Sequence, residues 1–500
     1  MARRLRVAGL ATLLVLAVAA CEGTWTTNPA PSPVRAVHAA LLHTGKVLLI
    51  AGSGNDPDQF AAGTFKTAIY DPATGTLRSD IPTPYDLFCS GHAFLPDGRL
   101  LVAGGTSAYA DSTTHVPYKG EKRVRIFDPV TETYQSAPSM AIGRWYPTLA
   151  SKADGTIVAV AGFDDQGRHS NTFQTYSPAT NAWSADQPIG TWASGVGVYS
   201  PLYPSMHLLA DGRFFYSGVH VFAAGPNTPP YRWDVDTNTL KWMDSNAALD
   251  VTRRDQAASV LLPPAQAQKV MVIGGGQELN TNVAVASTAV IDLSASNPTY
   301  TSGPPIDAAK MYVSAVILPD GRVLETGGAT GYRMNPTSAF VRSTQILDPK
   351  TMTWAKAPDA TFGRTYHSGA LLLPDGRVLT FGGNPHDGSF EMNLELYSPG
   401  YMTKPRPAIS AAPTDVTWSA GFPVTTDGPI ASAVLIRPSA VTHSSDSDQR
   451  SVDLAVSHAS ATGATLTIPA NHNITPTGWY MLFVRSSDGT PSVARWVHVA

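Results

Sequence analysis

Residues Gly91–Gly105 read GHAFLPDGRLLVAGG, which is an apolar run, an Asp-Gly turn, a second apolar run and a pair of glycines. Asp-Gly between two such runs is a strong short-range signal of a β-hairpin. The pattern recurs at His38–Gly52, Tyr146–Gly162, Tyr203–Gly218, Tyr312–Gly328 and Tyr366–Gly383. The turn glycines are 53, 57, 57, 109 and 55 residues apart, and a degenerate copy at Ala257–Gly276 falls in the long interval. The sequence therefore contains seven units.

A second pair of short strands is predicted in most units. It surrounds an Asp-Pro or Ser-Pro corner, as in TAIYDPATGTL from Thr67 and TQILDPKTMTW from Thr344. Four strands in each unit, with a glycine pair after the second, resemble the kelch type of β-propeller blade. We therefore expect an all-β chain in which residues 21–404 form a seven-bladed kelch-type β-propeller.

The repeat stops after Pro399, and Pro405 and Pro407 mark a boundary. Beyond it, short alternating runs such as SVDLAVSHAS from Ser451 are separated by turn residues. This pattern is typical of a small immunoglobulin-like β-sandwich, which we expect over residues 405–500.

Composition excludes two broad classes of protein. Hydrophobic residues make up 43% of the chain, so it has enough apolar material for a core and is not a disordered protein. The formal net charge is only -3 and charged residues make up 15%, so the basic excess of a nucleic-acid-binding protein is missing. We therefore expect no nucleic-acid partner, and we expect a monomer.

The first twenty residues read as a targeting segment. Arg3, Arg4 and Arg6 precede an apolar run at 7–20 that is short for a membrane span. Small residues directly before Cys21 predict a lipoprotein-type signal at 1–20, with Cys21 lipidated; an ordinary secretory signal is the alternative. Either reading takes the mature chain out of the cytoplasm, with membrane contact only through the lipid anchor.

Cys89 is the one other cysteine in the sequence. With Cys21 lipidated or removed, Cys89 has no disulfide partner in an oxidising compartment. It is therefore either an inert buried residue or a thiol with its own chemistry. Composition does not decide between these readings.

The repeat supplies a register in which the blades can be compared. Nine residues before the turn glycine stand Cys89, Tyr146, Tyr203, Tyr312 and His367, with Tyr366 beside the last. Equivalent positions of a rotational repeat lie at one height around the axis, so these side chains are expected to converge. The plain alternative is that aromatic side chains only fill the central hole. A histidine together with phenol oxygens, however, is a mixed ligand set that suits Cu(II).

Four segments together resemble the copper radical oxidases, the family of galactose oxidase and glyoxal oxidase. They are DLFCSGHAFLPDGRLLVAGG from Asp86, RWYPTLASKADGTIVAVAG from Arg144, RTYHSGALLLPDGRVLTFGG from Arg364, and RPSAVTHSSDSDQR with GWYMLFVRSSDGTPSVARWVHV in the last domain. The order matches along the mature chain, and the RWYP sequence is closer to the glyoxal oxidase branch.

The resemblance implies a role for each matching residue. Cys89 would be joined through its sulfur to the ring of Tyr146, giving a thioether-modified tyrosine that holds a radical. Tyr366 would be the axial copper ligand and the base, and His367 and His443 would be equatorial ligands. His443 would reach the site on a hairpin from the last domain, and the oxygen of Tyr146 would complete the protein ligands.

The implied activity is the two-electron oxidation of small aldehydes or primary alcohols, with dioxygen reduced to hydrogen peroxide. Copper accepts one electron and the tyrosyl radical the other. Two alternatives remain open at this point. One is a noncatalytic kelch propeller that binds a glycan or protein at the cell surface, and the other is a degenerate relative that binds copper without making the radical.

The sequence departs from the galactose oxidase pattern at one place. That enzyme has an indole after the glycine pair of the Tyr146 blade, where this chain reads Ala161-Gly162-Phe163-Asp164. The candidates to shield the radical instead are Phe163, Trp145 and Trp192.

Weaker candidates for contact with substrate at the mouth of the site are Arg254, Tyr203 and Tyr312.

Overall fold

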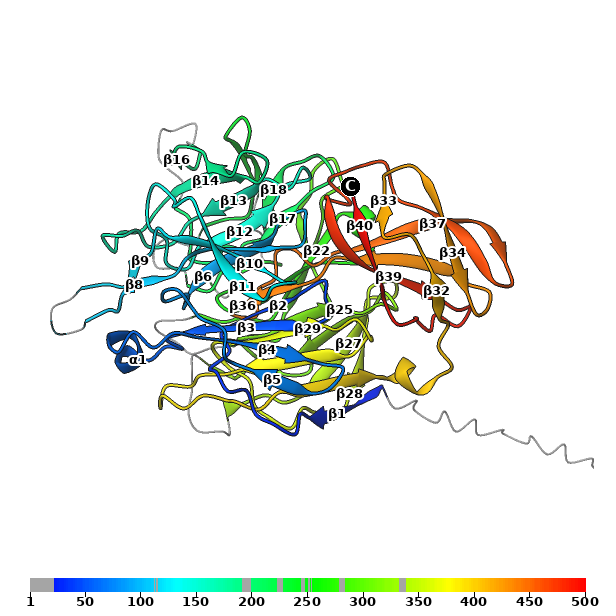
Figure 1. Cartoon of the computed structure of the whole chain (residues 1–500), viewed down its shortest axis with the longest axis horizontal. Coiled ribbons are helices and arrows are strands. Elements are labelled where there is room, and N and C mark those ends of the chain that lie inside the picture. The colour runs from blue at the N-terminus through cyan, green and yellow to red at the C-terminus, as the bar shows by residue number, and fades with distance from the viewer. Residues whose placement is uncertain are drawn as a thin grey trace, which may run out of the picture.

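Repeated antiparallel sheets account for most of the chain (Figure 1). The computed structural model describes residues 22–111, 113, 116–190, 199–222, 228–243, 248–250, 252, 254–277, 284–331 and 339–500. Seven sheets of four or five strands follow one another as blades, and an eight-stranded sheet comes after them. The all-β propeller and sandwich predicted from the repeat are confirmed.

Each blade runs from an innermost strand outward in chain order. Blade 1 contains β2 (His38–Leu41), β3 (Val47–Gly52), β4 (Lys66–Asp71) and β5 (Thr76–Arg78). Blade 2 contains β6 (Ser90–Phe94), β7 (Leu100–Gly104), β10 (Val124–Asp128) and β11 (Thr133–Ala137). Blade 3 contains β12 (Thr148–Ser151), β13 (Ile157–Val160), β14 (Thr172–Ser177), β15 (Ala182–Trp183) and β16 (Gln187–Pro188). Blade 4 contains β17 (Met206–Leu208), β18 (Phe214–Tyr216), β19 (Tyr231–Asp234) and β20 (Thr239–Trp242).

The remaining blades follow the same order. Blade 5 contains β21 (Ala258–Leu261), β22 (Lys269–Ile273), β23 (Thr288–Asp292) and β24 (Tyr300–Ser302). Blade 6 contains β25 (Ser314–Ile317), β26 (Val323–Thr326), β27 (Thr344–Asp348) and β28 (Thr353–Ala357). Blade 7 contains β29 (Ser368–Leu372), β30 (Val378–Gly382) and β31 (Glu395–Pro399).

The ring is closed by the amino-terminal strand. β1 (Gly23–Thr27) pairs antiparallel with β31, so that Gly23 lies opposite Pro399 and Thr27 opposite Glu395. Blade 7 therefore takes its outermost strand from the beginning of the described chain. This contact joins the two ends of the propeller, covers the edge of β31 and leaves β1 as the outer strand of blade 7.

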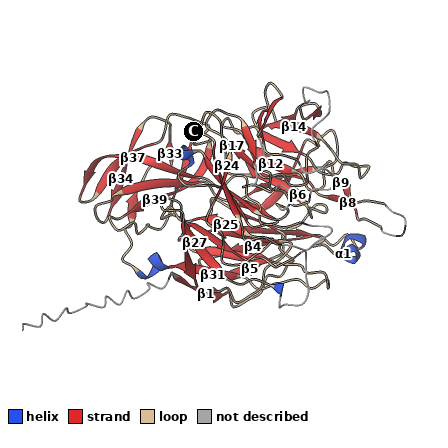
Figure 2. Cartoon of the chain, turned by 180° about the vertical axis from the view of Figure 1, so that it is seen from behind, coloured by secondary structure: helices blue, strands red, loops and turns tan. Residues whose placement is uncertain are grey.

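Helices contribute little to the described part of the chain (Figure 2). They are α1 (Pro57–Ala61) and the short 3-10 turns η2 (Ala265–Ala267) and η4 (Gly400–Thr403). Asp56 caps α1 because its carboxylate accepts hydrogen bonds from the Asp58 and Gln59 backbone N–H groups. A small hairpin of β8 (Thr106–Ala108) and β9 (Lys119–Gly120) extends from blade 2. Among these residues no helix is long and apolar enough to span a membrane.

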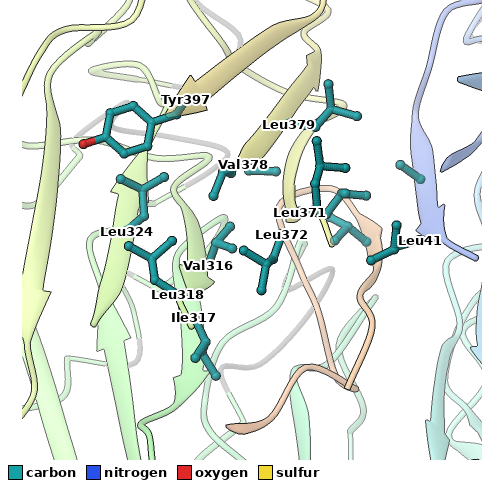
Figure 3. Close-up of a cluster of buried hydrophobic side chains, with 14 of the residues drawn as sticks. Leu41, Val316, Ile317, Leu318, Leu324, Leu371, Leu372, Val378, Leu379 and Tyr397 are labelled. Carbon is teal, nitrogen blue, oxygen red and sulfur yellow. The ribbon is translucent and has the colours of Figure 1, made fainter. Parts of the chain in front are cut away.

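Apolar side chains of neighbouring blades interdigitate to form the core. Figure 3 shows this between blades 6 and 7, where Val316 and Ile317 of β25 lie near Leu371 and Leu372 of β29. All four side chains are buried, because the innermost strands face other blades on both sides. Each such side chain contributes about 1.5–3 kcal/mol of burial free energy.

The carboxy-terminal sandwich follows η4. Its strands are β32 (Ile409–Ala411), β33 (Asp415–Val416), β34 (Gly421–Thr426), β35 (Ser432–Ile436), β37 (Ser451–Ser460), β38 (Gly463–Thr467), β39 (Gly478–Arg485) and β40 (Arg495–Val499). The connection from β35 to β37 leaves the sandwich and carries β36 (Ala440–Thr442), which pairs with β2 of blade 1. This connection, orange in Figure 1, thus reaches the innermost strand of the propeller.

His207 joins blades 4 and 5 and gives the fold a predictable response to acid. Its Nε2 lies 2.7 Å from the Ser259 hydroxyl, and burial together with the charge of Arg450 lowers the pKa of His207 from 6.5 to about 3. The unfolded chain takes up this proton below pH 6.5, whereas the folded chain does not until about pH 3, so stability is lost as the pH falls.

We expect His207 to account for about 2 kcal/mol of the stability lost between about pH 6.5 and pH 4.5. His207→Gln keeps a side chain that can bond Ser259 but does not titrate. Denaturant unfolding at several pH values should therefore show a shallower acid decline in the variant. Equal slopes for both proteins would contradict the assignment.

Candidate metal centre

The residues picked out by the repeat register share an unusual backbone conformation. Each precedes the innermost strand of its blade, and each has positive φ: Cys89 62°, Tyr146 64°, Tyr203 46°, Tyr312 63° and His367 61°. Residues other than glycine rarely adopt this left-handed conformation, and such strain is concentrated at functional sites. The common conformation turns these five side chains toward the axis in the same way.

Blade 5 supplies a sixth member that the sequence register missed. Gln256 has φ 58° and precedes β21. Its N–H donates to the His220 carbonyl, and its own carbonyl accepts the N–H of Tyr312 at 2.7 Å. Counting back from a turn glycine failed here because this blade turns through Pro263-Pro264 and η2 instead. Counting two residues back from the inner apolar run would have found it.

Backbone hydrogen bonds link successive members of this ring. The Tyr146 N–H donates to the Cys89 carbonyl at 3.0 Å, and the Tyr203 N–H donates to the Tyr146 carbonyl at 3.0 Å. The blades are therefore held at one height where the side chains meet.

Two phenol oxygens and two imidazole nitrogens converge on one point. The Tyr146 and Tyr366 hydroxyls are in direct contact. Nε2 of His443 lies 2.8 Å from the Tyr146 oxygen, and Nε2 of His367 lies 3.4 Å from it. The site brings together blade 3, blade 7 and, through His443, the connection from the sandwich. All four side chains are buried.

The outer nitrogen of each histidine is held by a polar neighbour. Nδ1 of His443 lies 2.6 Å from the Thr442 hydroxyl, and Nδ1 of His367 lies 3.3 Å from Oδ1 of Asn384. Asn384 is itself oriented by a hydrogen bond from Asn55 at 2.7 Å. Such outer contacts fix the ring and leave Nε2 to bind a metal ion, as in most protein metal sites.

Cys89 lies beside this group. Its sulfur, His367 and His443 present ligand atoms within 4.8 Å of one another. Burial raises the pKa of the Cys89 thiol, and a hydrogen bond with the Tyr146 side chain opposes that rise. The sulfur is therefore neighbour to both the histidines and the Tyr146 phenol.

Burial also sets the protonation of the converging groups. It raises the pKa of Tyr146 well above its usual value, and the nearby Cys89 and Tyr366 add to the rise. It lowers the pKa of His443 well below its usual value, to which His367 also contributes. Neutral imidazoles keep the lone pair that a metal needs, and a bound cation would favour the phenolates. Two imidazoles and two phenols are a donor set that suits Cu(II).

An indole does lie against Tyr146, although it comes from a different position than in galactose oxidase. The ring centroids of Trp145 and Tyr146 are 3.9 Å apart. Phe163 stacks on Trp145 with centroids 5.5 Å apart and an interplanar angle of 4°. Of the three shielding candidates, Trp145 makes the contact, Phe163 supports it, and Trp192 lies outside the described residues.

Tyr203 and Tyr312 are buried beside the site. The Tyr203 hydroxyl donates to the Ser90 carbonyl at 2.6 Å, and its ring lies 4.6 Å from that of Tyr146. The Tyr312 ring lies 6.1 Å from that of Tyr366. These placements favour packing against the metal-site rings over contact with substrate.

Arg254 belongs to a set of buried cations that brace the blades. Its guanidinium donates to the carbonyls of Gly274 at 2.8 Å and Ser287 at 3.2 Å, and the residue is 1% exposed. Corresponding bonds are made by Arg144 to Ala161, by Lys310 to Ser343 and by Arg364 to Gly382. The geometry thus disfavours the expected contact between Arg254 and substrate.

Replacing Arg254 with methionine is expected to lower the free energy of unfolding by about 3 kcal/mol, because two buried carbonyls lose their donor. The KM for a substrate that the enzyme oxidises should not change. Denaturant unfolding and steady-state kinetics measure the two effects. A raised KM with unchanged stability would instead place Arg254 in contact with substrate.

Comparison with known proteins agrees with this architecture. A family model described as glyoxal oxidase N-terminus matches residues 55–401, well over half of the chain. The chain belongs to this family. A second model, the galactose oxidase-like early set domain, matches residues 406–499 of this glyoxal oxidase family member.

Curated relatives extend over nearly the whole chain. A protein named galactose oxidase from Gibberella zeae is 27% identical over 93% of this chain and 69% of its own length. Aldehyde oxidase GLOX from Vitis pseudoreticulata is 26% identical over 97% of this chain and 98% of its own length. A solved structure, described as a fungal alcohol oxidase of the AA5 family in complex with copper, shares the fold with a TM-score of 0.80. It is 22% identical and covers 96% of this chain and 100% of its own.

Proposed function

We propose that this member of the glyoxal oxidase family is a copper radical oxidase. It oxidises small primary alcohols or aldehydes by two electrons and reduces dioxygen to hydrogen peroxide. The observation that carries the proposal is the meeting of Tyr146, Tyr366, His367 and His443 around one point, with Cys89 beside Tyr146. The names of the galactose oxidase and aldehyde oxidase relatives support the same activity.

The four converging residues are the proposed copper ligands. Copper, when bound, supplies a Lewis acid for the substrate hydroxyl and accepts one of the two electrons. Tyr366 takes the hydroxyl proton on its phenol oxygen, since it is the second phenol of the site. Thr442 and Asn384 keep the two histidines in place during this transfer.

Tyr146 accounts for the second electron. In the proposed active state its ring has lost one electron, and it takes the hydrogen from the carbon that becomes a carbonyl. A thioether from Cys89 stabilises that state by spreading the unpaired spin over sulfur. The bond forms when the thiol loses its S–H hydrogen and the ring one C–H hydrogen, and dioxygen takes up both to become hydrogen peroxide.

Trp145 is the proposed shield of the oxidised ring. The indole lies on Tyr146 with centroids 3.9 Å apart and is 5% exposed. It excludes water from one face of the ring. Tyr203, 4.6 Å from the Tyr146 ring, covers another side.

We also propose that residues 21–404 form the propeller and that residues 405–500 form the sandwich, which supplies one ligand. The signal at 1–20 and lipidation of Cys21 lie outside the described residues, and we propose that they place a monomeric oxidase outside the cytoplasm. Its partners are a small aldehyde or alcohol and dioxygen.

Mass spectrometry after aerobic copper loading tests the proposal. The oxidase predicts a linked peptide containing Cys89 and Tyr146, lighter than the separate peptides by two hydrogens, together with peroxide from glyoxal, methylglyoxal, glycolaldehyde, glycerol or galactose. A copper-loaded protein without the link would be the degenerate relative. A protein that neither binds copper nor forms the link would be the noncatalytic kelch propeller.

A further inference from the structure

A continuous series of oxidisable rings leads from Tyr146 toward the surface. The Trp145 ring lies against the Tyr146 ring. Tyr118 stacks on Trp145, with ring centroids 4.4 Å apart and an interplanar angle of 11°. Tyr109 follows, with its centroid 5.2 Å from that of Tyr118. Tyr146 and Trp145 are buried, whereas Tyr118 and Tyr109 are half-buried.

The outer end of the series has a built proton acceptor. The Tyr109 hydroxyl lies 2.7 Å from the Ser53 hydroxyl, which in turn lies 2.7 Å from Oδ2 of Asp86. Asp86 is 2% exposed, and burial raises its pKa to about 6. A tyrosine loses an electron most readily when its phenol proton can move to a neighbouring base. Tyr109 can pass its proton to Ser53 as Ser53 passes its own to Asp86, and both protons return when the electron is replaced.

We propose that Trp145, Tyr118 and Tyr109 form an electron relay, through which a one-electron oxidant in solution oxidises the buried Tyr146. The relay rests on the proposed function, because that function needs Tyr146 to lose one electron before the first turnover. Tyr146 itself is completely buried, so a bulky oxidant does not reach its ring directly.

The electron count is simple. The external oxidant takes one electron from Tyr109 or Tyr118. That electron is replaced by one from Tyr146, which passes outward through Trp145. The net change is one electron from Tyr146 to the oxidant, and ferricyanide, for example, becomes ferrocyanide. No bond is made or broken, because the Tyr146 phenol has already lost its proton as a copper ligand in the proposed site.

The composition of the aromatic cluster supports a redox role. Tryptophan and tyrosine are the most easily oxidised aromatic side chains, whereas phenylalanine is not oxidised under such conditions. Phe163 also stacks on Trp145, and Phe88 stacks on Tyr109, yet neither is needed to connect Tyr146 with the surface. The unbroken path consists of oxidisable rings only.

The test follows activation of the copper-loaded, crosslinked protein. The protein is first reduced by one electron and then mixed with ferricyanide, and the visible absorption of the tyrosyl radical and the bleaching of ferricyanide are followed in time. Two variants should form the radical at least about tenfold more slowly than the wild type. They are Tyr118→Phe and the double variant that carries both Tyr118→Phe and Tyr109→Phe. After full activation, their peroxide turnover should equal that of the wild type.

Two further variants separate electron transfer from packing. Tyr134→Phe makes the same substitution in the same blade, where the ring packs on Phe127 outside the relay, and should activate at the wild-type rate. Tyr118→Trp restores an oxidisable ring and should restore rapid activation, which a role in packing alone does not predict.

Wild-type activation rates in the double variant, at wild-type copper content, would overturn the relay. So would a Tyr118→Trp variant as slow as Tyr118→Phe. If the wild-type protein forms neither the Cys89–Tyr146 link nor a radical, the proposed function itself fails and the relay fails with it. A linked, radical-forming wild type with unaffected variants defeats the relay alone.

Discussion

Replacing Cys89 with serine is expected to reduce peroxide production by about a thousandfold or more, equivalent to about 4 kcal/mol of barrier. Serine has nearly the same size and can occupy the left-handed position, so the packing around Tyr146 should persist. It cannot form the thioether, and the oxidised Tyr146 ring then lacks its stabilising sulfur. Peroxide release with the best substrate of the screen measures the effect.

Copper content and peptide mass are the controls for this variant. The four proposed ligands are unchanged, so Cys89→Ser should bind copper as the wild type does while its Cys89-region and Tyr146 peptides stay separate. Wild-type peroxide production by a copper-loaded serine variant would refute the radical assignment. Loss of copper as well would instead assign the sulfur to the metal.

Replacing Tyr366 with phenylalanine is expected to lower kcat by about 10²–10⁴, the usual contribution of a positioned base. The substitution removes one oxygen and keeps the ring that stacks on His367 with centroids 3.7 Å apart. Tyr146, His367 and His443 remain as copper ligands. The link between Cys89 and Tyr146 should therefore still form, and steady-state kinetics should show the loss chiefly in kcat.

Tyr312→Phe is the matched control, because Tyr312 is a buried tyrosine before the innermost strand of blade 6, and its ring lies 6.1 Å from that of Tyr366. It should retain nearly wild-type turnover. Equal losses in the two variants would show that the site responds to any missing hydroxyl and would remove the special role of Tyr366.

The repeat made the propeller predictable because a rotational fold places the same pattern in every unit. The turn glycines gave the register, and the register selected Cys89, Tyr146 and His367, which the backbone places in one conformation. Gln256 escaped because its blade lacks the turn glycine. The ligand set needed the family resemblance as well, since no spacing relates His443 to the propeller repeat.

The sequence named Trp145 as one of three candidate shields but could not choose among them. Trp145 directly precedes Tyr146, and neighbouring residues on an extended chain usually point to opposite sides. The positive φ of Tyr146 breaks that rule and lets both rings meet. Arg254 was expected at the mouth because its charge was the visible feature, whereas its carbonyl partners belong to other strands of the blade.

The pairing of β1 with β31 has a consequence for biogenesis. Gly23 pairs with Pro399, so the ring stays open until the chain has been synthesised as far as Pro399, and closing it brings together residues separated by most of the sequence. Such nonlocal pairing slows folding. The active centre shares this delay, since its last side chain, His443, comes from even later in translation. Assembly of the proposed copper site therefore has to wait for synthesis of the last domain, and a product truncated before His443 would lack one of the four proposed ligands.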